Sequence, residues 1–180
     1  VASGVGGLGA ALVHDFDTTV FADASYELTA PSTIALSSGR HLVLYDTRFD
    51  RVGGSNRSEF LSYLTLNGSP LSIGRSQGFL RRLSGNDEAI MSGGGIITVA
   101  ADDQLLTLST QRSDSNPNAG TPTTVRAANG TAIQLLKLDD SWDFLSASRS
   151  SNQGGTVGTT AVDVVYDTLE ADSSLGSAFT

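Results

Sequence analysis

Apolar and polar residues alternate with a period of two along much of this chain, a pattern that predicts β-strands. The clearest strand covers residues 41–49, His41 to Phe49. A second covers 59–66 and stops at Asn67-Gly68, a dipeptide typical of tight hairpin turns. Other strands are predicted at 71–73, 78–83, 95–100, 104–110 and 132–138, with weaker ones near 11–21, 26–29 and 33–36. No helical periodicity stands out beside them.

These segments amount to roughly eight to ten short strands with turn signals about every 8–12 residues. Such spacing predicts an all-β fold, an antiparallel β-sandwich or barrel. The polar stretch 112–128 contains Pro117 and Pro122, so it is predicted to be a long surface loop. The Gly93-Gly94-Gly95 run is predicted to form a bulge or turn ahead of a strand.

Four motifs in order resemble the tumour-necrosis-factor-like jelly roll, especially the globular heads of complement-type proteins. Residues 39–45 resemble the family's Gly-x-Tyr-x-Phe-x-Tyr strand, and 64–68 resemble its Leu-Asn-Gly hairpin. Residues 92–105 resemble its paired strands around a Gly-Asp turn, and 132–138 occupy the place of its closing strand. The chain departs from the family at Asp102-Asp103, which replaces Gly-Asp, and in having no collagen-like stalk.

The resemblance implies an antiparallel β-sandwich with jelly-roll topology and a non-enzymatic role in assembly or ligand binding. Trimers are usual in the family, so the resemblance also implies self-association, although the missing stalk leaves the trimer open. The fold by itself is a limited guide to function, because one fold serves many functions.

The end of the chain repeats the pattern of its beginning. Residues 161–168 align with 11–18, and in both copies an aromatic residue precedes an Asp-Thr pair. With a slip of one residue, 177–180 align with 26–29. The chain is therefore predicted to consist of an N-terminal lead at 1–10, a jelly-roll domain at 11–138, a Ser/Gly/Asn-rich linker at 139–160, and a C-terminal extension strand at 161–180.

The extension has two interpretations, the first strand of a following tandem repeat or a strand given to a neighbouring copy. In either case Val162, Val164 and Tyr166 point to one face of the strand and are candidate assembly residues, together with Phe179. Strand addition gains affinity from backbone hydrogen bonds and specificity from alternate side chains.

Composition narrows the classes of function. The net charge of −8 argues against a protein that binds nucleic-acid phosphates. The chain has no cysteine, which excludes thiol catalysis and disulfides, and it has no apolar run long enough to predict a membrane-spanning helix. The first ten residues lack a basic segment and an initiator Met, and they read as a mature or processed start, not as an intact signal peptide. The protein is expected to be extracellular or surface-associated.

Residues that could carry chemistry have simpler structural explanations. His14 and His41 are the only histidines, and both lie in predicted strands, so an edge or packing role is expected for each. Asp114, Asn116 and Asn118 alternate like the start of a calcium loop, but Val125 falls where such a loop has glutamate, and a solvated turn explains the same residues. No catalytic residue, metal or cofactor is predicted.

The sequence therefore predicts a non-enzymatic, secreted structural protein that self-assembles into a fibre or array by jelly-roll packing and by strand exchange or tandem linkage. The alternative is an adhesin or receptor-binding module, with a surface glycan as partner. In that case the 112–128 loop and the turn at 84–87 would carry the contacts.

Overall fold

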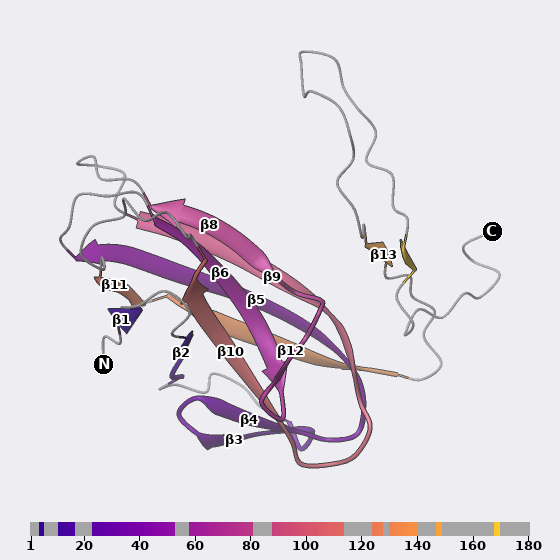
Figure 1. Cartoon of the computed structure of the whole chain (residues 1–180). Helices are drawn as coiled ribbons and strands as arrows, with labels where there is room; N and C mark the ends of the chain where they lie inside the picture. The colour runs from indigo at the N-terminus through magenta and orange to yellow at the C-terminus, as the bar shows by residue number, and fades with distance from the viewer. Residues whose placement is uncertain are drawn as a thin grey trace. The chain divides into compact units, whose positions relative to one another are not determined.

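The computed structural model describes residues 4–5, 11–16, 23–52, 58–80, 88–113, 124–127, 130–139, 147–148 and 168–169. The chain divides into two compact units, Val1–Lys137 and Leu138–Thr180. Within the described residues every regular element is a strand, as the sequence predicts. The chain is an all-β protein with the architecture of an antiparallel jelly-roll sandwich (Figure 1).

Fourteen strands are described. They are β1 Gly4–Val5, β2 Ala11–Val13, β3 Tyr26–Ala30, β4 Thr33–Leu36, β5 Gly39–Val52, β6 Ser58–Leu66, β7 Ser69–Pro70, β8 Ser76–Leu80, β9 Glu88–Val99, β10 Gln104–Arg112, β11 Thr124–Ala127, β12 Ala132–Leu138, β13 Ala147–Ser148 and β14 Thr168–Leu169. The last two pair with each other in a small separate sheet.

The first large sheet is organised around β5. Strand β9 pairs with it antiparallel from Gly39↔Val99 to Asp50↔Glu88. On the other edge of β5 lie β12 and β11, and β11 in turn pairs with β1. The long strand β5 thus fixes the positions of four others.

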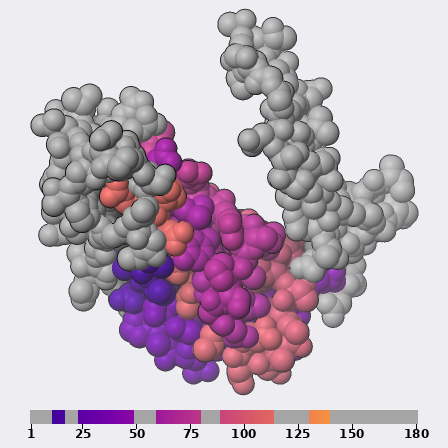
Figure 2. Space-filling view, in the orientation of Figure 1, coloured from indigo at the N-terminus to yellow at the C-terminus, as the bar shows by residue number. Residues whose placement is uncertain are grey.

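The second large sheet is organised around β10. Strand β6 pairs along one edge of it, and β2 and β4 share the other edge. Strand β3 extends the sheet beyond β4, while β7 and β8 extend it beyond β6. As a result of this pairing, strands that are distant in sequence lie side by side. Figure 2 shows N-terminal and later residues meeting on one continuous surface.

The main core lies between the two sheets. The first sheet contributes Val43, Tyr45, Ile97 and Val99. The second contributes Ile34, Leu36, Leu64, Leu106 and Leu108. Each inward position is followed by an outward one, because successive side chains of a strand point to opposite faces. A smaller cluster of Phe60 and Met91 continues the core toward β2 and β8.

Two turns place non-glycine residues in the left-handed region. Asn67 and Gly68 both have positive φ, 50° and 77°, which is the combination that a two-residue type I′ hairpin requires. Asp103 has φ 63° at the turn between β9 and β10. Beside it, Asp102 Oδ1 accepts a hydrogen bond from the Ser38 amide at 2.7 Å, so the chain's Asp-Asp pair also ties this turn to the start of β5.

Three sequence predictions need correction within the described residues. The three glycines lie inside β9, which begins at Glu88, because their lack of side chains lets β9 lie against β5 and its neighbours. Residues 71–73 form no strand: the Leu71 amide donates to the Leu64 carbonyl of β6 at 2.9 Å, but the pairing goes no further, and Leu71 and Ile73 pack on the core. The predicted 112–128 loop contains β11 and the end of β10, and the polar Arg112 is buried.

Candidate functional site

The outer face of the first sheet carries a row of exposed apolar side chains. Ile90 of β9 is 69% exposed, Leu136 of β12 is 51% exposed and Leu44 of β5 is 46% exposed. All three point away from the core, since their neighbours Met91, Leu135 and Tyr45 pack inward. Single exposed apolar residues are ordinary, but three on adjoining strands of one face mark a candidate contact surface.

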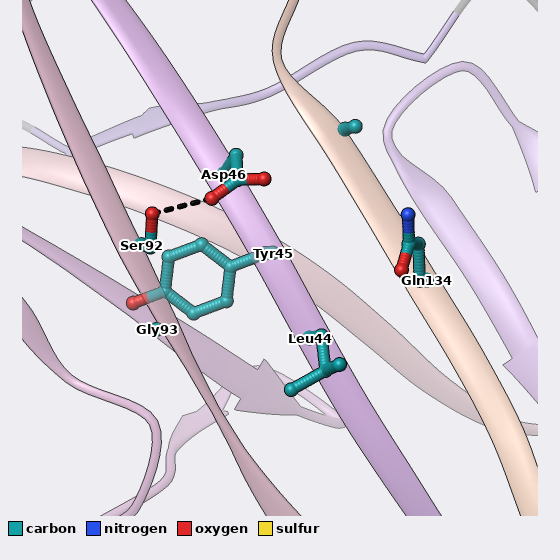
Figure 3. A pocket seen from close by; sticks show the side chains of 7 residues that line it. Leu44, Tyr45, Asp46, Ser92, Gly93 and Gln134 are labelled. Atoms are coloured by element: carbon teal, nitrogen blue, oxygen red, sulfur yellow. Dashed lines mark hydrogen bonds between the residues drawn. The ribbon is translucent and has the colours of Figure 1, made fainter.

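A depression of about 260 Å³ opens on this face (Figure 3). Its lining comes from three strands, with Leu44, Tyr45 and Asp46 from β5, Ser92 and Gly93 from β9, and Ala132 and Gln134 from β12. Small residues on β9 and β12 leave the space that larger side chains would fill.

The polar groups of the depression are held in place by neighbours. Ser92 Oγ donates a hydrogen bond of 2.5 Å to Asp46 Oδ1, between two residues that are directly opposite in the β5–β9 register. The other carboxylate oxygen of Asp46 points toward β12, on which Gln134 lies (Figure 3). The depression therefore presents an anionic acceptor and an amide beside the apolar wall of Leu44.

Tyr45 and Gly93 form the floor behind these groups. The Tyr45 hydroxyl lies 2.5 Å from the Gly74 carbonyl oxygen and 3.1 Å from that of Ser62, so it ties β5 to the opposite sheet. Burial raises the pKa of Tyr45 to about 12. A Cβ at position 93 would overlap this hydroxyl, which explains the glycine there.

A second polar group is buried between the sheets, at the β2 end of the core. His14 Nε2 forms a 2.9 Å hydrogen bond with Thr110 Oγ1, which is 2.6 Å from Ser62 Oγ. Ser62 Oγ in turn lies 3.2 Å from Thr47 Oγ1, and Thr47 donates to the Met91 carbonyl at 3.2 Å. We name these four side chains, His14, Thr110, Ser62 and Thr47, the buried polar row.

Each hydroxyl has one proton to donate, and this fixes which group donates and which accepts in every hydrogen bond of the buried polar row. Thr47 uses its one hydroxyl proton on Met91, so it accepts from Ser62, and Ser62 then accepts from Thr110. Thr110 must therefore accept from the Nε2–H of a neutral His14. Desolvation by burial lowers the pKa of His14 to about 4, with a smaller opposing effect of Asp15. All four side chains are buried, so the row joins the two sheets and presents no accessible nucleophile.

His41 is fixed in a similar way at the other end of β5. Its Nε2–H donates to the Ser37 carbonyl at 2.9 Å, which leaves Nδ1 to accept from the Tyr26 hydroxyl at 3.2 Å. Burial lowers the pKa of His41, and burial with the nearby Asp23 raises the pKa of Tyr26 to about 12. Both histidines thus have the packing roles that the sequence predicts.

The predicted assembly residues Val162, Val164, Tyr166 and Phe179 lie outside the described residues, as do Asp114, Asn116 and Asn118. Within the part of the chain that the structure describes, no cluster of three acidic, histidine or cysteine side chains is placed to hold a metal ion. Over that same part, no helix has the length and apolar character needed to cross a membrane.

Sequence reasoning missed the depression because its members are far apart along the chain. Leu44 and Asp46 lie at outward positions of β5, and the clear alternation of apolar and polar residues in this strand predicts that both side chains share its outer face. Which residues of β9 and β12 stand next to them depends on strand pairing, which the pattern of one strand does not specify.

No protein-family profile matches the chain. No curated protein sequence matches it. Among solved structures it is similar to the Eiger TNF from S. frugiperda, with a TM-score of 0.40 and 15% sequence identity, over 79% of this chain and 94% of that one.

Proposed function

We propose that this chain is a non-enzymatic structural module, secreted or surface-associated, that self-assembles into a fibre or array. The observation that carries the proposal is the outer face of the first sheet, where Ile90, Leu136 and Leu44 are exposed and Leu44 also lines a depression. Burying an apolar side chain of this size contributes about 1.5–3 kcal/mol, so a second copy that covers this face would be held by several such contributions.

A second contact comes from the C-terminal segment 161–180, whose pattern repeats that of the first strand region. Either this segment continues into a further repeat, or it pairs with a neighbouring copy. Packing through the sheet face and linkage through a strand together would extend an assembly beyond a dimer, because the two contacts use different surfaces.

The test is the particle size of the purified chain, measured by light scattering and seen by electron microscopy. We expect the full chain to form particles larger than a monomer. Leu44→Lys should reduce their size without lowering the melting temperature, because Leu44 is already half exposed and a lysine there disrupts only the contact between copies. Leu105→Lys is the matched control, because Leu105 is a leucine of similar exposure (41%) on the outer face of the second sheet, away from the proposed contact. A monomeric full chain at all concentrations would contradict the proposal.

Deletion of residues 161–180 tests the strand contact separately. We expect the shortened chain to fold and to form smaller particles than the full chain. Particles of unchanged size would show that the sheet face alone supports assembly, and the donor-strand part of the proposal would then be wrong.

A ligand-binding module is the second candidate, and the depression is the observation that favours it. An oriented carboxylate, an amide and a small apolar wall are groups that bind a hydroxyl-rich ligand such as one sugar unit of a glycan. Glycan binding by monomeric protein, lost in Asp46→Ala and retained in Asp102→Ala, would favour this candidate over assembly.

A further inference from the structure

Strand β2 is a short strand with a well-defined place in the second sheet. Its three residues pair with β10 as Ala11↔Gln111, Leu12↔Thr110 and Val13↔Ser109. The His14 amide continues this pairing by donating to the Leu108 carbonyl of β10 at 2.9 Å, whereas the Phe16 amide donates to the Pro31 carbonyl in the turn between β3 and β4. We call the position beside β10 that residues 11–16 occupy the β2 seat.

Alternate side chains of this segment enter the core. Leu12 packs against the Phe60–Met91 cluster, and Phe16 packs against the main core. His14 between them is 2% exposed and ends the buried polar row at Thr110. The side chains of Ala11, Val13 and Asp15 point outward and are exposed.

The sequence at 161–167 has the same arrangement of side chains. Val162, Val164 and Tyr166 stand at the positions of Leu12, His14 and Phe16, and each is apolar or aromatic. Of the outward positions, 11 and 161 are both alanine, whereas Val13 and Asp15 correspond to Asp163 and Val165. A strand in the seat is held by β10 through backbone groups, which every non-proline residue offers equally.

We propose that the β2 seat also accepts residues 161–167 of a second copy of the chain, which displace β2 of the receiving copy. This inference rests on the proposed self-assembly and specifies where the donated strand binds. In the exchanged arrangement Ala161 lies opposite Gln111, Val162 opposite Thr110 and Asp163 opposite Ser109.

The buried polar row tolerates this exchange. With Val164 in place of His14, Thr110 loses the bond that it accepts but keeps the 2.6 Å bond that it donates to Ser62. Ser62, Thr47 and Met91 keep their bonds unchanged, so no buried hydroxyl is left without a partner. Valine also fills the position without the cost of burying an imidazole.

Engineered cysteines test the exchange directly, because the chain has none of its own. One preparation carries Ala161→Cys and the other carries Gln111→Cys, and the two are mixed and oxidised. Directly opposite residues on antiparallel strands lie within disulfide range. We expect a disulfide-linked dimer of the two variants, with residues 161 and 111 joined in the same peptide pair by mass spectrometry.

Two controls accompany this experiment. Ala11→Cys with Gln111→Cys in a single chain should form a disulfide within that chain and so verifies the geometry of the seat. Val162→Cys in place of Ala161→Cys moves the thiol to the opposite face of the donated strand. We expect it to give at least tenfold less disulfide-linked dimer.

The outcomes separate this inference from the proposed function. Large particles without the 161–111 link would overturn the exchange and leave self-assembly through the sheet face intact. Absence of both particles and link would overturn both. The link in particles that also shrink on deletion of 161–180 supports both.

A pair of charge substitutions gives an independent measurement. Val164→Asp places a carboxylate at the position of the buried His14, and we expect it to abolish the link and to reduce particle size to that of the deletion. Val165→Asp places the same charge at the position of the exposed Asp15, and we expect no effect. Equal effects of the two substitutions would contradict the proposed register.

Discussion

At the scale of single residues, the polar side chains inside the sandwich are as specifically arranged as the apolar ones. The buried polar row crosses the core from the end of β2 to β9, and each hydrogen bond in it has its own donated proton. Such networks stabilise a fold when every member is satisfied and destabilise it when one member changes its charge. His14 is the member of the row whose charge changes with pH.

Acid should therefore destabilise the protein through His14. Its pKa is about 4 in the folded chain and 6.5 when unfolded, so the unfolded state binds the extra proton as the pH falls below 6.5. The stabilisation is complete above pH 6.5 and is lost progressively as the pH falls through 4, by up to about 3 kcal/mol. The free energy of unfolding, measured by denaturant titration at pH 7, 5 and 4, checks this.

The control for this prediction is His14→Gln, which keeps a donor for Thr110 and carries no titrating proton. The variant leaves the neighbouring Asp15 and the buried Arg112 of β10 unchanged. The wild-type stability should fall more steeply with acid than that of the variant. Parallel pH profiles would contradict the prediction.

At the scale of elements, short local signals fix where strands stop. The β6–β7 hairpin turns at Asn67 and Gly68, and Asn67 Oδ1 also accepts from the Leu105 amide at 2.8 Å. The Asn67 amide donates to the Leu105 carbonyl at 2.8 Å, so the same turn is attached to β10. One dipeptide thus both ends β6 and secures it to the centre of the second sheet.

Gly68→Ala should destabilise the protein by about 1–2 kcal/mol, because a side chain at φ 77° is strained. A Cβ there would meet no atom within 4 Å, so the backbone conformation alone is responsible. Ser69→Ala, at the next exposed residue, is the matched control and should change stability little. Thermal denaturation of both variants measures the difference. Equal melting temperatures would show that the turn tolerates a side chain.

At the scale of the whole molecule, assembly must overcome the repulsion between copies that each carry a net charge of −8. The proposed contacts are apolar and made through backbone groups, so salt should screen the repulsion without weakening them.

Particle size should accordingly increase between low salt and about 0.5 M NaCl, where the screening length falls to a few ångströms. Light scattering over a salt series measures this, and sucrose of equal osmolarity serves as the control for solvent effects. A decrease in particle size with salt would indicate an interface held by ion pairs and would contradict the apolar contact.

The sequence by itself determined the class of fold, because alternation and turn residues act locally. The strand at 41–49 and the turn at 67–68 were predicted from neighbouring residues and were confirmed, since each depends on backbone conformations that nearby side chains favour. The packing roles of His14 and His41 were also predicted, from their places in alternating segments.

Only the tertiary structure decided which residues meet. The glycines at 93–95 were predicted to form a turn, but they lie inside β9 against β5. Residues 71–73 were predicted to form a strand, but they keep only one backbone bond to β6, from the Leu71 amide to the Leu64 carbonyl, and pack on the core through Leu71 and Ile73. The depression joins three strands, and His14 meets Thr110 across 96 positions of sequence. Such contacts depend on strand pairing and on how the two sheets face each other, and the period of a single strand carries no information about either.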